Sequence, residues 1–330
     1  MAAAPMLDTP RELLRRDERN PVLTVRDLPH LEGGVFNPGA VLVDGETLLL
    51  VRVEDRRGIS HLAVARSADG VTRWRVEERP AMVPAPGQYP EEAHGIENPR
   101  ITYLPALERY AIAYTASSSS GPLVALATTP DFKHFERLGA VLPPDNKDAA
   151  VFPVQFNGRW AMLHRPRYGS RGGPAHIWIA FSPDLKHWGE HRLVLRARHG
   201  PYWDAGHIGT ATPPLLTSEG WLLLYHAVRE TAGGKSYRLG LALLDAEDPA
   251  RVVRRSSEWV LAPDAPYESI GRGGVVFPCG WVRDSENVRI YYGAGDQYVA
   301  VAHASVPELL EWLRHHCSEP DQLESAPSPV

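Results

Sequence analysis

The chain has 330 residues, of which 43% are hydrophobic and 23% are charged, and its formal net charge is -5 at pH 7. This composition is typical of a protein with a substantial core, and the weak negative charge excludes a long-range field that attracts nucleic acid or an anionic membrane. We therefore expect neither nucleic acid nor a membrane as a partner.

The location in the cell is predicted from cysteine use and from the N-terminus. Cys279 and Cys317 are too few for a disulfide framework and lack the spacing of a CxxC motif, which is typical of a reducing compartment. The N-terminus runs into charged residues without the apolar stretch of a secretory signal. These features predict a cytoplasmic protein.

The first expected element is a short helix in an N-terminal extension, residues 1–30. Thr9, Pro10 and Glu12 match an N-cap, a proline at the first helical position and a capping-box glutamate. The helix is predicted to continue over Leu13 and Leu14.

A repeated unit of about 60 residues then covers residues 31–305. Each copy has a polar or aromatic residue beside proline, a short apolar run, a turn, and a strongly apolar strand that ends in polar residues. The five copies start at Phe36-Asn37-Pro38, Asn98-Pro99, Phe152-Pro153, Thr212-Pro213-Pro214 and Phe277-Pro278. Five copies of a four-stranded unit predict an all-β fold, a five-bladed β-propeller, and disfavour an ordinary β-sandwich, which lacks evenly spaced copies.

Turn residues support this unit. Asp44-Gly45, Asn157-Gly158 and Glu219-Gly220 lie between the two apolar runs of their copies, where a tight hairpin needs residues that tolerate positive φ. A second type of loop contains an aspartate that tightens the turn and an aromatic residue that packs back between the sheets; these pairs are Asp69 with Trp74, Asp131 with Phe135, and Asp184 with Trp188.

The C-terminal segment, residues 306–330, is predicted to contain a helix and a disordered tail. Between Val306 and His316, Leu309, Leu310 and Leu313 share one helical face. The tail from Ser318 to Val330 is rich in proline, serine and glutamate. The expected architecture is thus a five-bladed propeller with short terminal helices.

In a propeller, the first strand of each blade lines the axis, so equivalent residues of the five copies form a ring at one mouth of the channel. The polar residues at these strand ends include amides, carboxylates, guanidiniums and histidines, which suit a neutral polyhydroxylated ligand and an oxyanion. Structural roles stay open for Arg52 and Arg165, which can bridge blades, and for His164 and His226 as wall residues. The histidines lack metal-ligand spacing such as HExxH, so we expect no metal site.

Several segments resemble a known family. FNPGAVLVDGETLLLVRVED, GIENPRITY, NKDAAVFP, MLHRP, IWIAFSPDLKHWG, WLLLYHAV, YRLGLALLDAEDP, VVFPCG and RIYYGAGD are similar, in this order, to signatures of glycoside hydrolase family 130. The family's members are five-bladed propellers that act on β-mannosides. Many are inverting phosphorylases that produce mannose 1-phosphate, and some are β-1,2-mannosidases that use water.

The resemblance also implies site residues. It places Asn37, Arg52, Asn98 and Asp296 around the mannosyl unit. It places Arg165, His207 and Tyr237 beside the attacking phosphate. The complete expected substrate-binding set is Asn37, Arg52, Arg100, Asp148, Asp204, Tyr225, His226 and Asp296, and the expected phosphate-binding set is Lys147, Arg165, Arg167, His207 and Tyr237.

Two residues depart from the family pattern. Asn98 stands where the family has its proton-donating aspartate, and an amide is no acid. Glu97 is the nearest substitute carboxylate, although neighbouring residues on a regular strand point to opposite faces. His207 replaces a phosphate-binding lysine, so phosphate affinity should fall and depend on pH, with Lys147 and Arg167 as candidates to compensate.

These observations predict an enzyme that cleaves β-mannosidic linkages of manno-oligosaccharides with inversion, with Asn98 and Glu97 at the catalytic position. Phosphorolysis is favoured over hydrolysis, for which Asp148, Asp204 and Glu268 are candidate bases. A non-catalytic glycan-binding propeller is the alternative that Asn98 motivates. We expect no cofactor, and inorganic phosphate is the expected co-substrate if the enzyme is a phosphorylase. Linkage, acceptor sugar and a homo-oligomeric state stay open.

Overall fold

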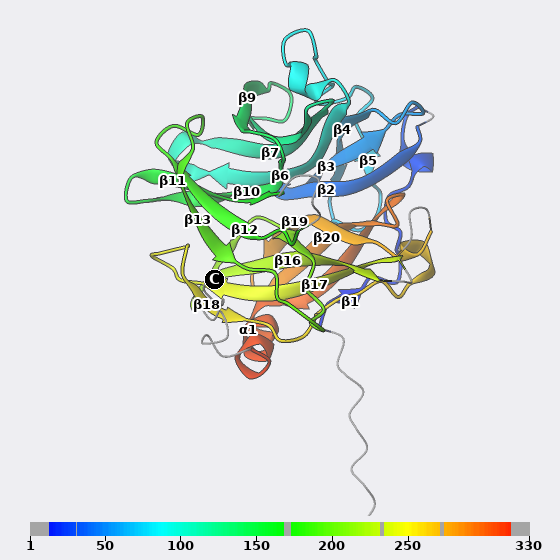
Figure 1. The fold of residues 1–330 in the computed structure, drawn as a ribbon. Helices are drawn as coiled ribbons and strands as arrows, with labels where there is room; N and C mark the ends of the chain where they lie inside the picture. The colour runs from blue at the N-terminus through cyan, green and yellow to red at the C-terminus, as the bar shows by residue number, and fades with distance from the viewer. Residues whose placement is uncertain (1–12, 31, 168–172, 232–233, 271–273, 318–330) are drawn as a thin grey trace, which may run out of the picture.

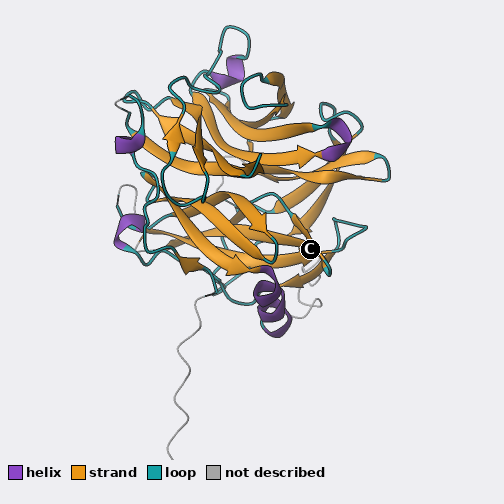
Figure 2. Ribbon diagram, turned by 180° about the vertical axis from the view of Figure 1, so that it is seen from behind, coloured by secondary structure: helices purple, strands orange, loops and turns teal. Residues whose placement is uncertain are grey.

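The computed structural model describes residues 13–30, 32–167, 173–231, 234–270 and 274–317. In this part of the chain, β-sheets form the body of the protein, and one α-helix lies at its edge (Figure 1). The same body seen from behind is again built of strands joined by loops and short helical turns (Figure 2). The all-β fold predicted from the repeats is confirmed.

The strands form five blades. Within each blade the chain runs from the innermost strand, at the channel, to the outermost strand, so the strand numbers rise outwards. The blades are β2 (Gly34–Val43), β3 (Glu46–Glu54), β4 (Ser60–Ser67) and β5 (Arg75–Val76); β6 (Gly95–Leu104), β7 (Arg109–Ser118), β8 (Gly121–Thr129) and β9 (Glu136–Leu142); β10 (Asn146–Phe156), β11 (Arg159–Pro166), β12 (Ile177–Ser182) and β13 (Gly189–Leu195); β14 (His207–Thr210) with β15 (Leu215–Thr217), β16 (Gly220–Thr231), β17 (Gly234–Leu244) and β18 (Val252–Arg255); and β19 (Val276–Asp284), β20 (Asn287–Ala294) and β21 (Tyr298–Ser305). Pairing inside each blade is antiparallel, and one parallel pair, Ser60 with Gly95, joins the first two blades.

The last blade takes its outermost strand from the other end of the chain. β1 (Arg15–Arg16) pairs with β21, with Arg15 opposite His303. Residues that the sequence assigned to an extension therefore complete the fifth blade. The predicted helix over Leu13 and Leu14 is wrong, because these residues form a bend before β1, and residues 9–12 of that helix lie outside the described residues.

Hydrophobic clusters fill the spaces between neighbouring blades and show the closure of the ring. In β3, Leu48 and Leu50 pack against the second blade, whereas Leu49 and Val51 pack against the fifth blade around Tyr291. The other interfaces have their own clusters, between the second and third, third and fourth, and fourth and fifth blades. Both faces of each blade are buried, which explains why the strands are continuous apolar runs.

The predicted turns are present. Asp44-Gly45 and Asn157-Gly158 have positive φ at both residues, as a tight hairpin requires, whereas at Glu219-Gly220 only Gly220 has positive φ. The Oδ1 atom of Asp69 accepts hydrogen bonds from backbone N–H groups two and three residues later, and Asp131 and Asp184 do the same in their blades. These carboxylates tighten the turns because they mimic a backbone acceptor.

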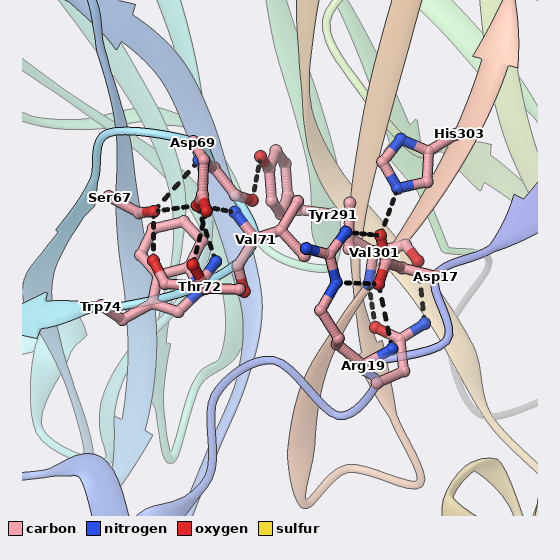
Figure 3. Close-up of polar contacts among 12 residues, drawn as sticks. Asp17, Arg19, Ser67, Asp69, Val71, Thr72, Trp74, Tyr291, Val301 and His303 are labelled. Carbon is pink, nitrogen blue, oxygen red and sulfur yellow. Dashed lines mark hydrogen bonds and ion pairs between the residues drawn. The ribbon is translucent and has the colours of Figure 1, made fainter.

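One of these turns helps to join the first blade to the last. Trp74 packs edge-on against Tyr291 with ring centroids 6.1 Å apart, and Tyr291 donates a hydrogen bond to Gly70 O (Figure 3). On the far side of this contact, Asp17 accepts hydrogen bonds from Arg19 and pairs with His303 (Figure 3). Polar contacts thus reinforce the apolar interface where the ring closes.

The C-terminal helix is confirmed as α1 (Val306–His315), and Leu309, Leu310 and Leu313 are buried as predicted. Among the described residues, short 3₁₀ turns span Val25–Asp27, Pro90–Glu92, Pro105–Leu107 and Pro266–Glu268. The tail from residue 318 lies outside the described residues. Cys279 and Cys317 are both free thiols, and no helix in the described ranges has the length and apolarity to cross a lipid bilayer.

Candidate active site

Three innermost strands carry a polar residue in the left-handed conformation. Asn37, Asn98 and Asp148 have φ values of 49°, 52° and 56°. Each lies in a β-bulge of β2, β6 or β10, where the pairing register shifts. Asparagine and aspartate tolerate this conformation, and a bulge redirects a side chain, so the three equivalent residues face the channel.

At the mouth between the first two blades, two amides and a guanidinium meet. Asn37 Nδ2 donates a hydrogen bond of 2.9 Å to Asn98 Oδ1, and Arg52 Nη1 donates to the same oxygen at 3.3 Å. Asn37 and Asn98 are 4% and 5% exposed. The contact orients Asn98, because a guanidinium has no acceptor and only the amide oxygen can face it.

Glu97 turns toward the same mouth. Arg52 Nη1 lies 3.2 Å from Glu97 Oε2, and Arg52 Nη2 lies 3.3 Å from Glu54 Oε2. Regular alternation would send Glu97 and Asn98 to opposite faces, but the bulge that begins after Glu97 breaks the alternation. The arrangement brings the Glu97 carboxylate beside the Asn98 amide.

Asp148 is the buried centre of a second group. Arg165 donates to its Oδ2 atom from Nε at 2.8 Å and contacts it from Nη2 at 2.7 Å, and His226 Nε2 lies 3.4 Å away. Burial by itself raises the pKa of Asp148, but the charges of Arg165 and His226 outweigh it and hold this pKa well below its usual range. Asp148 therefore stays ionised and orients Arg165.

Close packing around Asp148 requires a glycine. A Cβ atom on Gly209 would lie 2.5 Å from Asp148 Oδ2 and 2.6 Å from His226 Cε1. Any side chain at this position would displace His226 and the Asp148 carboxylate, which pairs with Arg165. The residue two positions before Gly209 is His207, so the same short strand provides both this close approach and a wall residue of the cavity described next.

A cavity of about 560 Å³ opens beside Arg165. All five residues of the expected phosphate-binding set line it, together with His226 and residues from the ends of β16 and β17. The predicted residues in the lining are Lys147, Arg165, Arg167, His207 and Tyr237. The structure thus brings the five residues together in one wall, and their role as phosphate ligands stays a prediction.

Burial changes the pKa values of His207 and Lys147, which both line the cavity. Burial lowers the pKa of His207, and the charges of Arg165 and Arg167 lower it further, so the imidazole is neutral near pH 7. Its buried Nδ1 atom has no hydrogen-bond partner among the described residues. Burial also lowers the pKa of Lys147, although nearby carboxylates oppose the shift.

Arg100 links the two groups of polar residues but is not available to a ligand. It is 1% exposed, and its guanidinium donates to the carbonyls of Ala211, Thr210 and Asn98 at 2.9, 2.7 and 3.2 Å. Its Nη2 atom also lies 3.5 Å from Asp148 Oδ1. The expected substrate-binding role of Arg100 is replaced by a structural one that ties the second blade to the fourth.

Asp204 and Tyr225 lie elsewhere, contrary to the sequence prediction. Asp204 is fully buried and pairs with Arg255 and with Arg198 Nη1 at 3.0 Å, and Tyr225 donates a hydrogen bond of 3.0 Å to it. Tyr225 also stacks on Trp203 in the core between the third and fourth blades. Because His226 faces the channel, strand alternation sends Tyr225 to the opposite face.

Two further residues of the sequence prediction, Asp296 and Glu268, lie in different parts of the fifth blade. Asp296 has a φ of 53° in the turn after β20 and lies next to β2, because Val35 N–H donates to Gln297 O. Glu268, a candidate base, is fully buried and accepts hydrogen bonds from Arg16 and Tyr292. The backbone of Asp296 thus lies beside the start of β2, whereas Glu268 supports the fifth blade.

The sequence prediction missed some charged residues of the cavity. Arg229, Glu230 and Lys235 line it from the β16–β17 hairpin, and the unusual length of the WLLLYHAVRET run was the available signal. A larger groove of about 770 Å³ lies beside α1, and no expected site residue lines it. Among the described residues, no cluster of three or more histidine, cysteine or acidic side chains has the arrangement of a metal site.

The fold and the cavity define a five-bladed propeller enzyme with a strongly cationic pocket at its channel. Residues 14–315 match the family model Glyco_hydro_130, which is described as beta-1,4-mannooligosaccharide phosphorylase. Beta-1,2-mannobiose phosphorylase from Listeria innocua is 34% identical over 90% of this chain and 98% of its own length. Beta-1,4-mannooligosaccharide phosphorylase from Ruminococcus albus is 30% identical over 93% of each chain.

A solved structure agrees with these sequence relatives. The complex of the Listeria innocua beta-1,2-mannobiose phosphorylase with beta-1,2-mannobiose superposes with a TM-score of 0.83 and 31% identity, over 92% of this chain and 99% of that chain. This chain belongs to glycoside hydrolase family 130. The resemblance stated from the sequence motifs is confirmed.

Proposed function

We propose that this enzyme cleaves β-mannosides by inverting phosphorolysis and releases mannose 1-phosphate. The observation that carries the proposal is the cavity in which Lys147, Arg165, Arg167, His207 and Tyr237 converge. Phosphate needs several charge-assisted hydrogen bonds, and arginine binds it in a planar, two-pronged manner. The names of the similar phosphorylases from Listeria innocua and Ruminococcus albus support the same reaction.

The candidate bases are all in ion pairs, which supports phosphorolysis over hydrolysis. Inverting hydrolysis needs a carboxylate that activates water, whereas a bound phosphate is already ionised. Asp148 pairs with Arg165, Asp204 pairs with Arg255, and Glu268 pairs with Arg16. Each of these carboxylates is fully buried in its ion pair, so none is a good base for water.

The mannosyl unit would lie over the mouth formed by Asn37, Arg52 and Asn98, with Asp296 at its edge. The amide NH₂ of Asn98 faces away from Arg52, so it is placed to donate to a sugar hydroxyl rather than to protonate an oxygen. The phosphate would approach the anomeric carbon from the Arg165 side. Attack from the face opposite the leaving oxygen gives inversion.

Glu97 is the proposed proton donor to the leaving oxygen. It shares the Nη1 atom of Arg52 with Asn98, whereas Glu54 contacts Nη2, and its side chain is 19% exposed at the mouth, so a substrate can reach it. A carboxyl group in its acid form can protonate the leaving oxygen as the glycosidic bond breaks, whereas an amide has no such proton to give. Asn98 and Glu97 would thus divide two tasks, sugar binding and proton transfer.

Incubation of the purified enzyme with β-1,2- and β-1,4-mannobiose, with and without phosphate, tests the proposal. Mannose 1-phosphate that forms only with phosphate supports phosphorolysis. Free mannose at the same rate in both conditions would assign hydrolysis instead. Binding of the disaccharide without turnover would favour a glycan-binding propeller, the function that Asn98 motivates.

A further inference from the structure

Glu268 is a fully buried carboxylate that holds the end of strand β20. Its Oε1 atom accepts hydrogen bonds of 2.8 Å from Arg16 Nε and from the hydroxyl of Tyr292, a residue of β20. Its Oε2 atom accepts bonds from Arg16 Nη2 at 3.0 Å and from the backbone N–H groups of Asp264 and Ala265 at 2.8 and 3.0 Å. All these partners are donors, so both carboxylate oxygens must act as acceptors.

The charge of Glu268 is needed for these contacts. Burial by itself raises the pKa of this carboxyl, but the hydrogen bonds from Arg16, Asp264 and Tyr292 outweigh burial and hold the pKa below its usual value. Glu268 is therefore ionised near neutral pH. A glutamine in its place would turn an NH₂ group toward other donors and would remove the charge with which Arg16 pairs.

The loop around Glu268, residues 264–270, packs against the turn that follows β20. The Val275 N–H donates to Glu268 O at 3.0 Å, and the Gly295 N–H donates to Val275 O at 3.0 Å. Gly295 has a φ of 60°, and a Cβ atom on it would overlap the carbonyl oxygen of Ile270. The loop thus fixes this turn through backbone contacts, in addition to the side-chain bond from Glu268 to β20.

The opposite side of the same segment packs against a residue of the channel mouth. Gly293 follows Tyr292 in β20, and a Cβ atom on Gly293 would overlap Asn37 Oδ1. Adjacent residues of a strand face opposite sides, so one side of β20 bonds to Glu268 while the other packs against Asn37. Asn37 Nδ2 in turn donates to Asn98 Oδ1 at 2.9 Å. A short path of direct contacts therefore leads from Glu268 to this pair of amides.

We infer that Glu268 is a positioning residue for the mannosyl unit, because it fixes residues 292–296, the segment against which Asn37 packs. The inference rests on the proposed function, in which Asn37 and Asn98 bind this sugar. Glu268 is not part of the lining of the cavity beside Arg165, so its effect should concern the sugar and not the phosphate. It touches no substrate and acts through β20.

Glu268→Gln tests this role through the two Michaelis constants. We expect the KM for mannobiose to rise about tenfold, because the loss of charge-assisted hydrogen bonds to a buried group loosens the segment behind Asn37. The KM for phosphate at saturating mannobiose should stay within about twofold. An unchanged KM for mannobiose, or an equal rise in both constants, would overturn the inference, since the contacts would then serve stability alone.

Arg16→Gln keeps the test decisive if Glu268→Gln does not fold. It removes the same ion pair from the partner that is 16% exposed, and the KM for mannobiose should rise in the same way while the KM for phosphate stays unchanged. A KM for mannobiose equal to that of the wild type would again overturn the inference.

Asp17→Asn is the matched control for a weakened N-terminal segment. Asp17 follows Arg16 and is 6% exposed, but it pairs with Arg19 and His303 instead of the Glu268 loop (Figure 3). The variant should lower the melting temperature and leave both Michaelis constants within about twofold. A rise in the KM for mannobiose as large as that in Arg16→Gln would show that any loosening of this segment has the same effect, and the inference would fall.

Calorimetry separates this inference from the proposed reaction. β-1,2- and β-1,4-mannobiose are titrated into the wild type and into Arg16→Gln and Glu268→Gln without phosphate. If no mannose 1-phosphate forms in the kinetic assay, phosphorolysis is refuted. The positioning role would still stand if the wild type binds either disaccharide about tenfold more tightly than the variants, and it falls if the affinities are equal or if the wild type binds neither.

Discussion

The Oδ1 atom of Asn98 accepts a hydrogen bond from Arg52 Nη1 at 3.3 Å, and the same nitrogen lies 3.2 Å from Glu97 Oε2. Arg52 therefore holds an amide and a carboxylate side by side at the channel mouth. A second carboxylate at position 98 would compete with Glu97 for the same guanidinium. The roles of these two neighbours are open to direct tests by substitution.

Asn98→Asp tests whether the amide limits catalysis. If Glu97 is the proton donor, the new carboxylate should change kcat for phosphorolysis of mannobiose by less than about threefold, since the acid is already present. Steady-state kinetics of both proteins provide the comparison. A rise in kcat of about a hundredfold would assign the general acid to position 98 and show that Glu97 does not donate the proton.

Glu97→Gln tests the proton donor itself. Loss of a general acid should lower kcat for mannobiose about a hundredfold or more. The loss should be much smaller for 4-nitrophenyl β-mannoside, because its leaving group departs without protonation. Glu54→Gln is the matched control, since Glu54 contacts the same arginine at 3.3 Å. Equal losses in the two variants on both substrates would show that only the charge balance around Arg52 matters.

His207→Lys tests how the histidine affects phosphate affinity in the cavity that we propose as the phosphate site. Burial and the charges of Arg165 and Arg167 lower the pKa of His207, so the wild-type side chain is neutral near pH 7. A lysine would add a permanent charge, and we expect the KM for phosphate to fall about tenfold. The KM for mannobiose at saturating phosphate should stay the same. An unchanged KM for phosphate would place the phosphate away from this position.

His164 gives a prediction for stability against pH. Burial and the neighbouring His191 lower the pKa of His164 to about 3. The unfolded chain binds the proton first as pH falls, so stability that is present above about pH 6.5 decreases toward pH 3, by up to about 1.4 kcal/mol per pH unit. In His164→Asn, unfolding by urea at pH 7 and pH 5 should show a smaller drop than in the wild type. Equal drops would mean that His164 titrates normally.

The repeat and its local turns were predictable from the sequence because they depend on neighbouring residues. Asp69 tightens its turn through N–H groups two and three residues away, and α1 buries leucines spaced along one helical face. The residues expected to bind phosphate line one cavity, and the expectation for Arg165, His207 and Tyr237 came from the family resemblance rather than from local preferences.

The predictions that failed depended on details that the repeat does not contain. Pro153 marked the third copy, but the bulge equivalent to Asn37-Pro38 lies at Asp148-Ala149, where no proline is present. Tyr225 was assigned to the channel together with His226, although only one of two adjacent strand residues can face it. A pattern of residue types does not show which alternate residues of a strand face the channel.

By itself, the sequence determined the five blades, their tight turns, the family and the cationic set around Arg165. Only the tertiary structure decided that Arg15 and Arg16 complete the last blade, that Glu97 shares Arg52 with Asn98, and that the β16–β17 hairpin adds Arg229 to the cavity. The physical reason is the same in each case. Local preferences determine strands and turns, whereas ring closure and bulges set which distant side chains meet.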